Sequence, residues 1–120
     1  MKNIDKHLEF FKRATNNDLA GEYVIKKGIL PYVRTNVEVS EFLTDFYDST
    51  LLYQDYLTIM EGVSDLSVFN ETTDIDTLKG AITYIVRSDR FREGFLLKQI
   101  KNGNMYLLLK NIKYKIIYCD

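Results

Sequence analysis

The chain has little of what metal sites, disulfides and most catalytic centres require. Its 120 residues include one cysteine, one histidine, one proline and no tryptophan. A zinc site needs several cysteine or histidine ligands, so we expect no bound metal, and no motif predicts any other cofactor. His7 and Cys119 lie at opposite ends of the chain, and no sequence pattern places them together for nucleophilic catalysis. A lone histidine on a helix is typical of a surface or boundary position. We therefore expect a protein that is not an enzyme.

Cysteine scarcity and the absence of long apolar runs also bear on location. A single thiol cannot form a disulfide within the chain, which favours a reducing, cytoplasmic setting. The longest unbroken apolar run, residues 105–109, is far below the roughly 18 residues of a membrane span. Residues 1–7 contain scattered charges and no apolar run of signal-peptide length. With no linker or repeat, the sequence predicts one domain over residues 1–120 that does not bind membranes.

Positive charge is missing from a long central segment. Residues 35–78 contain ten acidic residues and no lysine or arginine. The flanking segments 1–34 and 79–120 carry net charges of +3 and +6, which leaves the whole chain at −1. Folding must therefore either bring the opposite signs together or display one of them outward.

Apolar residues recur at helical spacing through most of the chain. The segments with this pattern are about 3–15, 35–48, 52–63, 73–88, 89–101 and 105 onwards. The sequence predicts an all-α domain, a compact bundle of about five or six short helices. A minor β-hairpin near residues 22–33 stays open, because short β-branched and aromatic runs lie there around a Lys-Lys-Gly turn. Pro31 would confine its strand to an edge.

Helix starts are predicted from capping patterns. Thr35 with Glu38, and Thr73 with Asp76, have capping-box spacing. A helix running beyond about residue 88 would bury Asp89, so we expect Ser88 or Asp89 to begin a new helix. That helix would bury Phe91, Phe95, Leu96 and Ile100. The tail at residues 114–119 fits either a helix end or a short strand.

The central helix predicts an acidic face. Four carboxylates fall within an arc of about 80° beside its apolar stripe; they are Glu38, Glu41, Asp45 and Asp48. Like charges at i and i+4 disfavour a helix by a few tenths of a kcal/mol per pair, so something basic should face them. We hypothesise a protein-interaction module that binds another protein with a basic surface through these four residues, with a homodimer as an open alternative.

A second cluster lies near residues 83–90. Thr83, Arg87 and Arg90 span an arc of about 60° if helical geometry continues, and a helix beginning near Asp89 would add free backbone N–H groups. One interpretation is an anion site for a phosphate or carboxylate, in a regulator or an enzyme. The other is that the arginines pair with carboxylates of the acidic segment, the commoner arrangement.

The run from Thr83 to Gly94 resembles a known family signature. It matches the core Thr-x-(Ile/Val)-x-Arg-x-x-Arg-Phe-x-x-Gly, and further matching residues are Asp76, Thr77, Leu78, Leu96, Gly103, Leu108 and Leu109. The pattern is similar to the C-terminal part of a family of small bacterial proteins of unknown function. The close match covers about 35 residues, and the lack of tryptophan is a departure. The resemblance implies a small helical bacterial domain and no particular activity.

Lysines predict an alternative function. They are concentrated towards the C-terminus, with tyrosines among them; the candidates are Lys98, Lys101, Lys110 and Lys113. A basic surface with aromatic side chains can grip a phosphate backbone and stack bases. A sequence pI of about 5.8 favours an ordinary lysine-coated surface, so nucleic acid is the second hypothesis.

Overall fold

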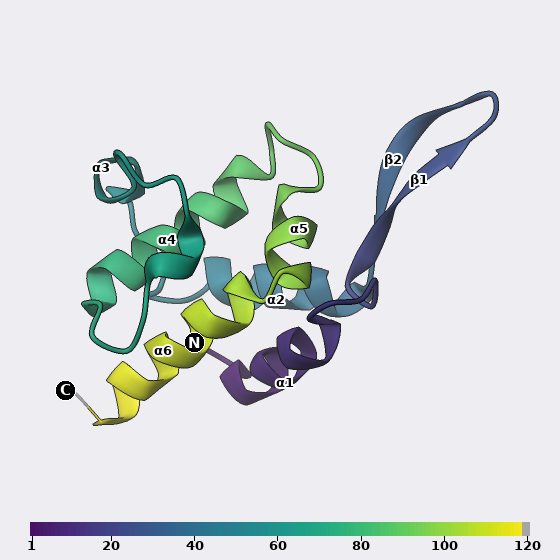
Figure 1. The fold of residues 1–120 in the computed structure, drawn as a ribbon. Coiled ribbons are helices and arrows are strands. Elements are labelled where there is room, and N and C mark those ends of the chain that lie inside the picture. Colours follow the sequence, from purple (N-terminus) through teal and green to yellow (C-terminus); the bar gives the residue numbers. More distant parts are fainter. Residues whose placement is uncertain (119–120) are drawn as a thin grey trace.

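The computed structural model of the chain describes residues 1–118, and at Tyr118 the backbone alone. Figure 1 shows the helices of this range gathered into one body from which a hairpin extends. The elements are α1 (Ile4–Ala14), β1 (Gly21–Lys26), β2 (Ile29–Thr35), α2 (Val37–Tyr47), α3 (Tyr56–Ile59), the 3₁₀ turn η1 (Leu66–Val68), α4 (Ile75–Ser88), α5 (Phe95–Lys101) and α6 (Asn104–Tyr118). The expectation of a mostly helical chain with a minor hairpin is confirmed. The prediction about the Cys119 thiol lies outside the described residues.

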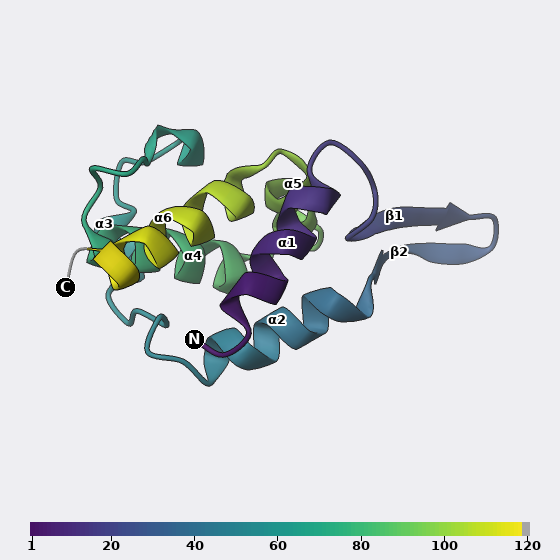
Figure 2. The ribbon, with the colours of Figure 1, turned by 90° about the horizontal axis from the view of Figure 1, so that it is seen from below.

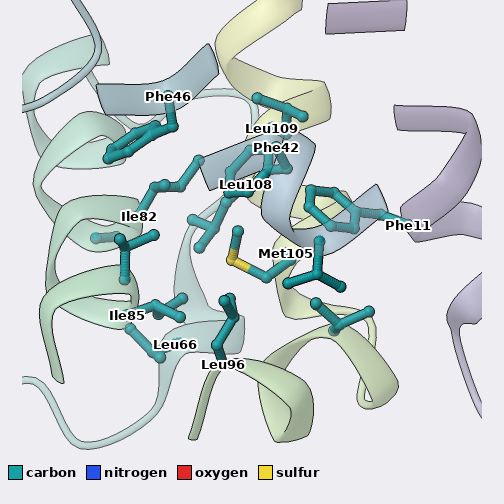
Figure 3. Packing of buried hydrophobic residues seen from close by; sticks show 14 of the residues in the cluster. Phe11, Phe42, Phe46, Leu66, Ile82, Ile85, Leu96, Met105, Leu108 and Leu109 are labelled. Carbon is teal, nitrogen blue, oxygen red and sulfur yellow. The ribbon is translucent and has the colours of Figure 1, made fainter. Parts of the chain in front are cut away.

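One cluster of buried apolar side chains holds the helices together. The rings of Phe11 on α1 and Phe42 on α2 meet edge to face, with centroids 4.9 Å apart. Figure 3 shows Ile82 and Ile85 of α4 on the opposite side of the cluster from Phe11, with Leu108 of α6 between them. These are the apolar stripes that the helical spacing predicts. The amphipathic pattern therefore specifies which face of α1, α2, α4 and α6 is buried.

Both predicted helix caps are displaced by one residue. Thr35 ends β2, where it pairs with Gly21, so its neighbour Asn36 caps α2 and accepts from the backbone N–H of Glu38. Asp74 caps α4 by accepting from the N–H of Thr77 at 3.1 Å. In each case the capping pattern locates the helix and a neighbouring Asx side chain makes the bond.

The helix predicted over residues 52–63 is wrong for most of its length. Only α3, four residues long, is helical there. The hydroxyl of Thr83 on α4 accepts from the backbone N–H of Tyr53 at 3.0 Å and holds the preceding segment as a loop. Ile59 then packs directly on Gly80, where an added Cβ would lie 2.9 Å from the Ile59 side chain. Tertiary contacts with α4 therefore replace the local helix.

The junction between α4 and α5 also differs from the prediction. α4 ends at Ser88 as expected, but residues 89–94 form turns and α5 begins only at Phe95. Asp89 does cap α5, although from a distance, because its Oδ1 accepts from the N–H of Leu96 at 3.0 Å. Phe91 is 90% exposed rather than buried. The tail continues α6 as a helix to Tyr118.

The hairpin projects away from the helices. Figures 1 and 2 show β1 and β2 extending beyond the helical body, and the longest dimension of the molecule is 53 Å. The strands are antiparallel, with Tyr23 opposite Val33 and Val24 opposite Tyr32. The ladder is irregular further out, where Lys26 faces Ile29 and β2 has one residue more than β1. Little of this element contributes to the core.

Candidate functional site

The predicted acidic face lies against α1. Lys6 Nζ donates to Glu41 Oε2 at 2.5 Å, and Arg13 lies 3.8 Å from Glu38. The prediction that something basic faces the acidic stripe is confirmed, and the basic group belongs to the same chain. The hydrogen bond to Glu41 raises the pKa of Lys6. Of the four carboxylates, only that of Asp48 has no ion-pair or hydrogen-bond partner in residues 1–118.

His7 is the least expected member of this contact. It is 1% exposed, so the surface or boundary position predicted for it is wrong. Its Nε2 lies 2.7 Å from Asp45 Oδ2, and its ring meets Phe42 edge to face with centroids 5.4 Å apart. The Nδ2 of Asn3 also donates to Asp45, at 3.2 Å. These hydrogen bonds, first that of His7, lower the pKa of Asp45. His7 thus joins α1 to α2 as a buried structural partner.

Part of the charge of the C-terminal lysines is paired within the chain. Lys101 donates to Asp18 at 2.9 Å, and Lys113 forms an ion pair with Asp5. Lys110 lies with its Nζ 5.8 Å from the ring centroid of Tyr106. Two of the four candidate lysines therefore form ion pairs with acidic residues of the N-terminal segment, which reduces the positive charge available to a phosphate backbone.

The arginine cluster pairs with tyrosines and not with carboxylates. Arg87 lies with its guanidinium carbon 5.7 Å from the ring centroid of Tyr56. Arg90 lies 5.8 Å from the ring of Tyr47 and donates to its hydroxyl at 3.4 Å. Within residues 1–118 neither arginine forms a salt bridge, so the expected pairing with carboxylates of the acidic segment is wrong, although both arginines contact tyrosines of that segment. The Nε of Arg87 is buried without a hydrogen-bond partner in that range.

The third member of that cluster has a structural role. Thr83 is buried, and its hydroxyl is engaged by the backbone of Tyr53. The helix N-terminus expected near Asp89 is absent, since that residue follows α4 and α5 begins later. The structure therefore brings Arg87 and Arg90 to neighbouring positions without the threonine or the helix dipole that the anion-site prediction includes.

The projecting hairpin is the surface that the sequence patterns do not single out. Leu30 is 87% exposed and Ile25 is 76% exposed, and further exposed apolar side chains are Tyr23, Ile29 and Tyr32. A signal was present in the sequence, because these apolar runs do not alternate with polar residues and so cover both faces of a two-stranded ribbon. An exposed apolar surface of this kind is typical of an interaction site.

The two edges of this hairpin differ. On β2, Pro31 has no backbone N–H, the extra residue makes the strand irregular, and the Val33 N–H already donates to Glu93 at 3.1 Å. Because Val33 donates its N–H to Glu93, Tyr23 opposite it turns its backbone outward. Ile25 has no partner in the ladder, and since the extra residue lies on β2, we infer from the alternation along β1 that its backbone has the same direction. No backbone partner for these outward groups exists within the described chain. The edge of β1 has neither a proline nor an extra residue, and it is open.

These features define a small, mostly helical domain with internally paired charges and a projecting hairpin. None of the helices in residues 1–118 combines the length and apolar character needed to cross a bilayer. Nor does that range contain a group of three or more histidine, cysteine, aspartate or glutamate side chains placed to hold a metal. The chain belongs to the Family of unknown function (DUF6508), whose model matches residues 3–116. No curated protein and no solved structure matches it.

Proposed function

We propose that this protein is a non-enzymatic protein-interaction module that associates through the open edge of β1. The observation that supports this most is the difference between the two hairpin edges. β2 carries the features that prevent strand addition, while β1 leaves the backbone groups of Tyr23 and Ile25 without a partner in the described chain. An extended segment can add to such an edge through main-chain hydrogen bonds. The projection of the hairpin makes the edge accessible (Figure 2).

The partner that β1 fits best is a second copy of the same strand. If two β1 strands pair antiparallel about a twofold axis at Val24, Tyr23 of each copy lies opposite Ile25 of the other. These are the residues with outward backbone groups, so they form the hydrogen-bonded pairs. In the same register, Glu22 of one copy faces Lys26 of the other. Each such opposite-charge pair contributes about 0.2–1 kcal/mol.

Charge order across the four strands supports this register. Glu22 already forms an ion pair with Arg34 of β2 in its own copy. Lys26 of the second copy would lie on the other side of Glu22, so positive, negative and positive side chains alternate on that face. A register shifted by two residues loses both charge pairs. In one direction Glu22 lies opposite an uncharged residue and Lys26 opposite a position beyond the strand end, and in the other direction the two residues exchange these places.

The two hypotheses from charge alone stay predictions. A basic protein partner on the face of Glu38, Glu41, Asp45 and Asp48 would have to compete with α1, which engages three of these carboxylates. Nucleic-acid binding through the C-terminal lysines would compete with Asp5 and Asp18. We therefore place the interaction surface on the hairpin.

The experiment is a charge exchange measured by sedimentation velocity. Glu22→Lys sets two positive charges opposite each other at both ends of the paired strands, and Lys26→Glu sets two negative charges there. Each variant alone should sediment as a monomer at concentrations where the unchanged protein is a dimer. An equimolar mixture of the two variants should regain the dimer, because opposite signs then face each other at both ends.

The mixture also separates interface effects from folding effects. Glu22→Lys loses the ion pair with Arg34 in either case, so damage to the hairpin itself would not be repaired by mixing. A protein that stays monomeric at the highest soluble concentration would exclude self-association. Dimers that survive both single substitutions would exclude this edge as the interface.

A further inference from the structure

A pocket of about 420 Å³ lies between α5 and the segment at residues 63–66. Its volume falls within the range of small-molecule sites in proteins. One face of α5 forms its wall, since Phe95, Lys98, Gln99 and Asn102 recur at i, i+3, i+4 and i+7. No residue of the hairpin, and neither Arg87 nor Arg90, lines this pocket, so an inference about it does not rest on the association proposed above.

Gln99 is the buried polar group of this wall. Its side chain is 5% exposed, and its Oε1 accepts from Asn104 Nδ2 at 2.7 Å and from Asn102 Nδ2 at 3.2 Å. Because both neighbours donate an amide N–H to the same atom of Gln99, that atom must be the oxygen, and this fixes the orientation of the side-chain amide. The Nε2 group therefore keeps two N–H donors without a partner in residues 1–118, on a side chain that lines the pocket. Among the described residues only Arg87 Nε is fully buried without a partner, so Gln99 Nε2 is not fully enclosed and an acceptor in the pocket can reach its donors.

The charges that line the pocket favour an anion. Arg92 and Lys98 line it, and neither forms a salt bridge within the described chain. The guanidinium carbon of Arg92 lies 4.2 Å from the ring centroid of Phe95, which holds its plane and leaves its N–H edges available. The one acid in the lining is Asp65, whose Oδ1 accepts from the N–H and hydroxyl of Ser67. The lining therefore has a net positive charge.

An aromatic corner completes the pocket. Tyr84 of α4 and Phe95 of α5 meet edge to face, with ring centroids 6.0 Å apart, and both line the pocket. Their surfaces can take a flat, weakly polar part of a ligand. Donors from Arg92, Lys98 and Gln99 would converge on its polar part, and donor groups alone select a ligand rich in acceptor oxygens.

We propose that this pocket binds a small organic anion, a phosphate ester or carboxylate that carries a flat ring. The anionic group lies between Arg92 and Lys98, an acceptor of the ligand receives the N–H donors of Gln99, and the ring rests against Tyr84 and Phe95. The ligand class follows from donors at one side and aromatic surface at the other.

The test is a titration followed by NMR of the Gln99 side-chain amide. The probes are adenosine, guanosine, cytidine and uridine 5′-monophosphates as phosphate esters, 4-hydroxybenzoate as a ring carboxylate, and inorganic phosphate as the anion without a ring. We expect saturable shifts of the Gln99 amide signals with at least one ring-bearing probe. Shifts with a nucleotide would show that the pocket takes a phosphate ester, and shifts with 4-hydroxybenzoate would show that it takes a ring carboxylate. Inorganic phosphate should bind at least tenfold more weakly. No shift with any ring-bearing probe at millimolar concentration would overturn the proposal.

Two substitutions make the test specific. Gln99→Glu keeps an acceptor for Asn102 and Asn104 but removes both N–H donors, and Arg92→Gln removes the stacked cation. Each should weaken binding at least tenfold, measured in every variant by the backbone amide signals of the residues that line the pocket, because Gln99→Glu has no side-chain amide to follow. Lys110→Gln, outside this pocket, is the matched control and should leave the affinity unchanged. Affinities that are equal in all three variants would show that the probe binds elsewhere and would contradict the proposal.

Discussion

The Nε2 atom of His7 lies 2.7 Å from Oδ2 of Asp45 and links the first helix to the acidic helix beneath the surface. The histidine ring meets the ring of Phe42 edge to face, and the carboxylate also accepts a hydrogen bond from Asn3. One residue of the supposed partner-binding face is therefore part of the structure that joins α1 to α2. This relationship makes the stability of the fold sensitive to acid.

Asp45→Asn should lower the free energy of unfolding at neutral pH. The folded-state pKa of Asp45 lies below its ordinary value of 3.8 because His7 and Asn3 hydrogen-bond to the carboxylate. Its stabilisation is therefore complete above about pH 4 and is lost as the pH falls through the folded-state pKa. Urea unfolding between pH 3 and pH 7 should show the difference between the two proteins shrinking in acid. Asp48→Asn is the control, and an equal effect from it would contradict this assignment.

Phe42→Ala and Phe91→Ala should differ sharply in their effect on stability. Phe42 is fully buried between α1 and α2, and its removal should cost about 3–5 kcal/mol in thermal or urea unfolding. Phe91 is almost fully exposed, so its removal should change stability by less than about 0.5 kcal/mol. A large loss from Phe91→Ala would mean that the α4–α5 junction is packed differently.

Glu93→Ala should release the edge of β2. The Glu93 carboxylate accepts from the backbone N–H of Val33 at an exposed position, where a hydrogen bond contributes about 0.5–1.5 kcal/mol. We expect hydrogen exchange of the Val33 amide to accelerate about tenfold, while core amides of α4 keep their protection. Glu61→Ala, far along the chain from the hairpin, is the control. Unchanged Val33 exchange would show that Glu93 does not protect this edge.

Gly21→Ala should disrupt the base of the hairpin. Gly21 has a φ of +153°, and an added Cβ would lie 2.2 Å from the carbonyl oxygen of Arg34. The strain should cost about 1–3 kcal/mol or separate the strands at this point, measured by unfolding and by amide exchange. Gly28→Ala meets no neighbouring atom and, with its φ of +81°, should cost about 1–2 kcal/mol. A smaller loss at Gly21 than at Gly28 would contradict the close approach of β2.

Helical regions and their buried faces could be predicted because that information is local. The spacing of Val39, Phe42 and Phe46 reports the buried face of α2 without knowledge of what packs on it. The helix predicted over residues 52–63 is wrong because a group distant in the sequence accepts a hydrogen bond from a backbone N–H of that segment. The hydroxyl of Thr83 engages Tyr53, thirty residues earlier in the chain, and helical spacing carries no sign of such a bond.

The candidate sites were harder to predict, because free charge depends on which partners folding supplies. Glu41 was predicted as part of a partner-binding face, and it lies against Lys6. Arg87 was expected to meet a carboxylate, and it lies over the ring of Tyr56. In both cases the local pattern indicates that a partner is needed but not which residue it is.

The amino-acid sequence by itself determined the mostly helical class, the segregation of charge along the chain and the apolar stripes of the core, because each depends on residues within a few turns of one another. Only the tertiary structure decided that the acidic face meets α1, that β1 keeps the open edge and that Gln99 leaves its N–H donors unpaired in a pocket. Those outcomes depend on groups that are distant in sequence and become neighbours only when the chain closes around its core.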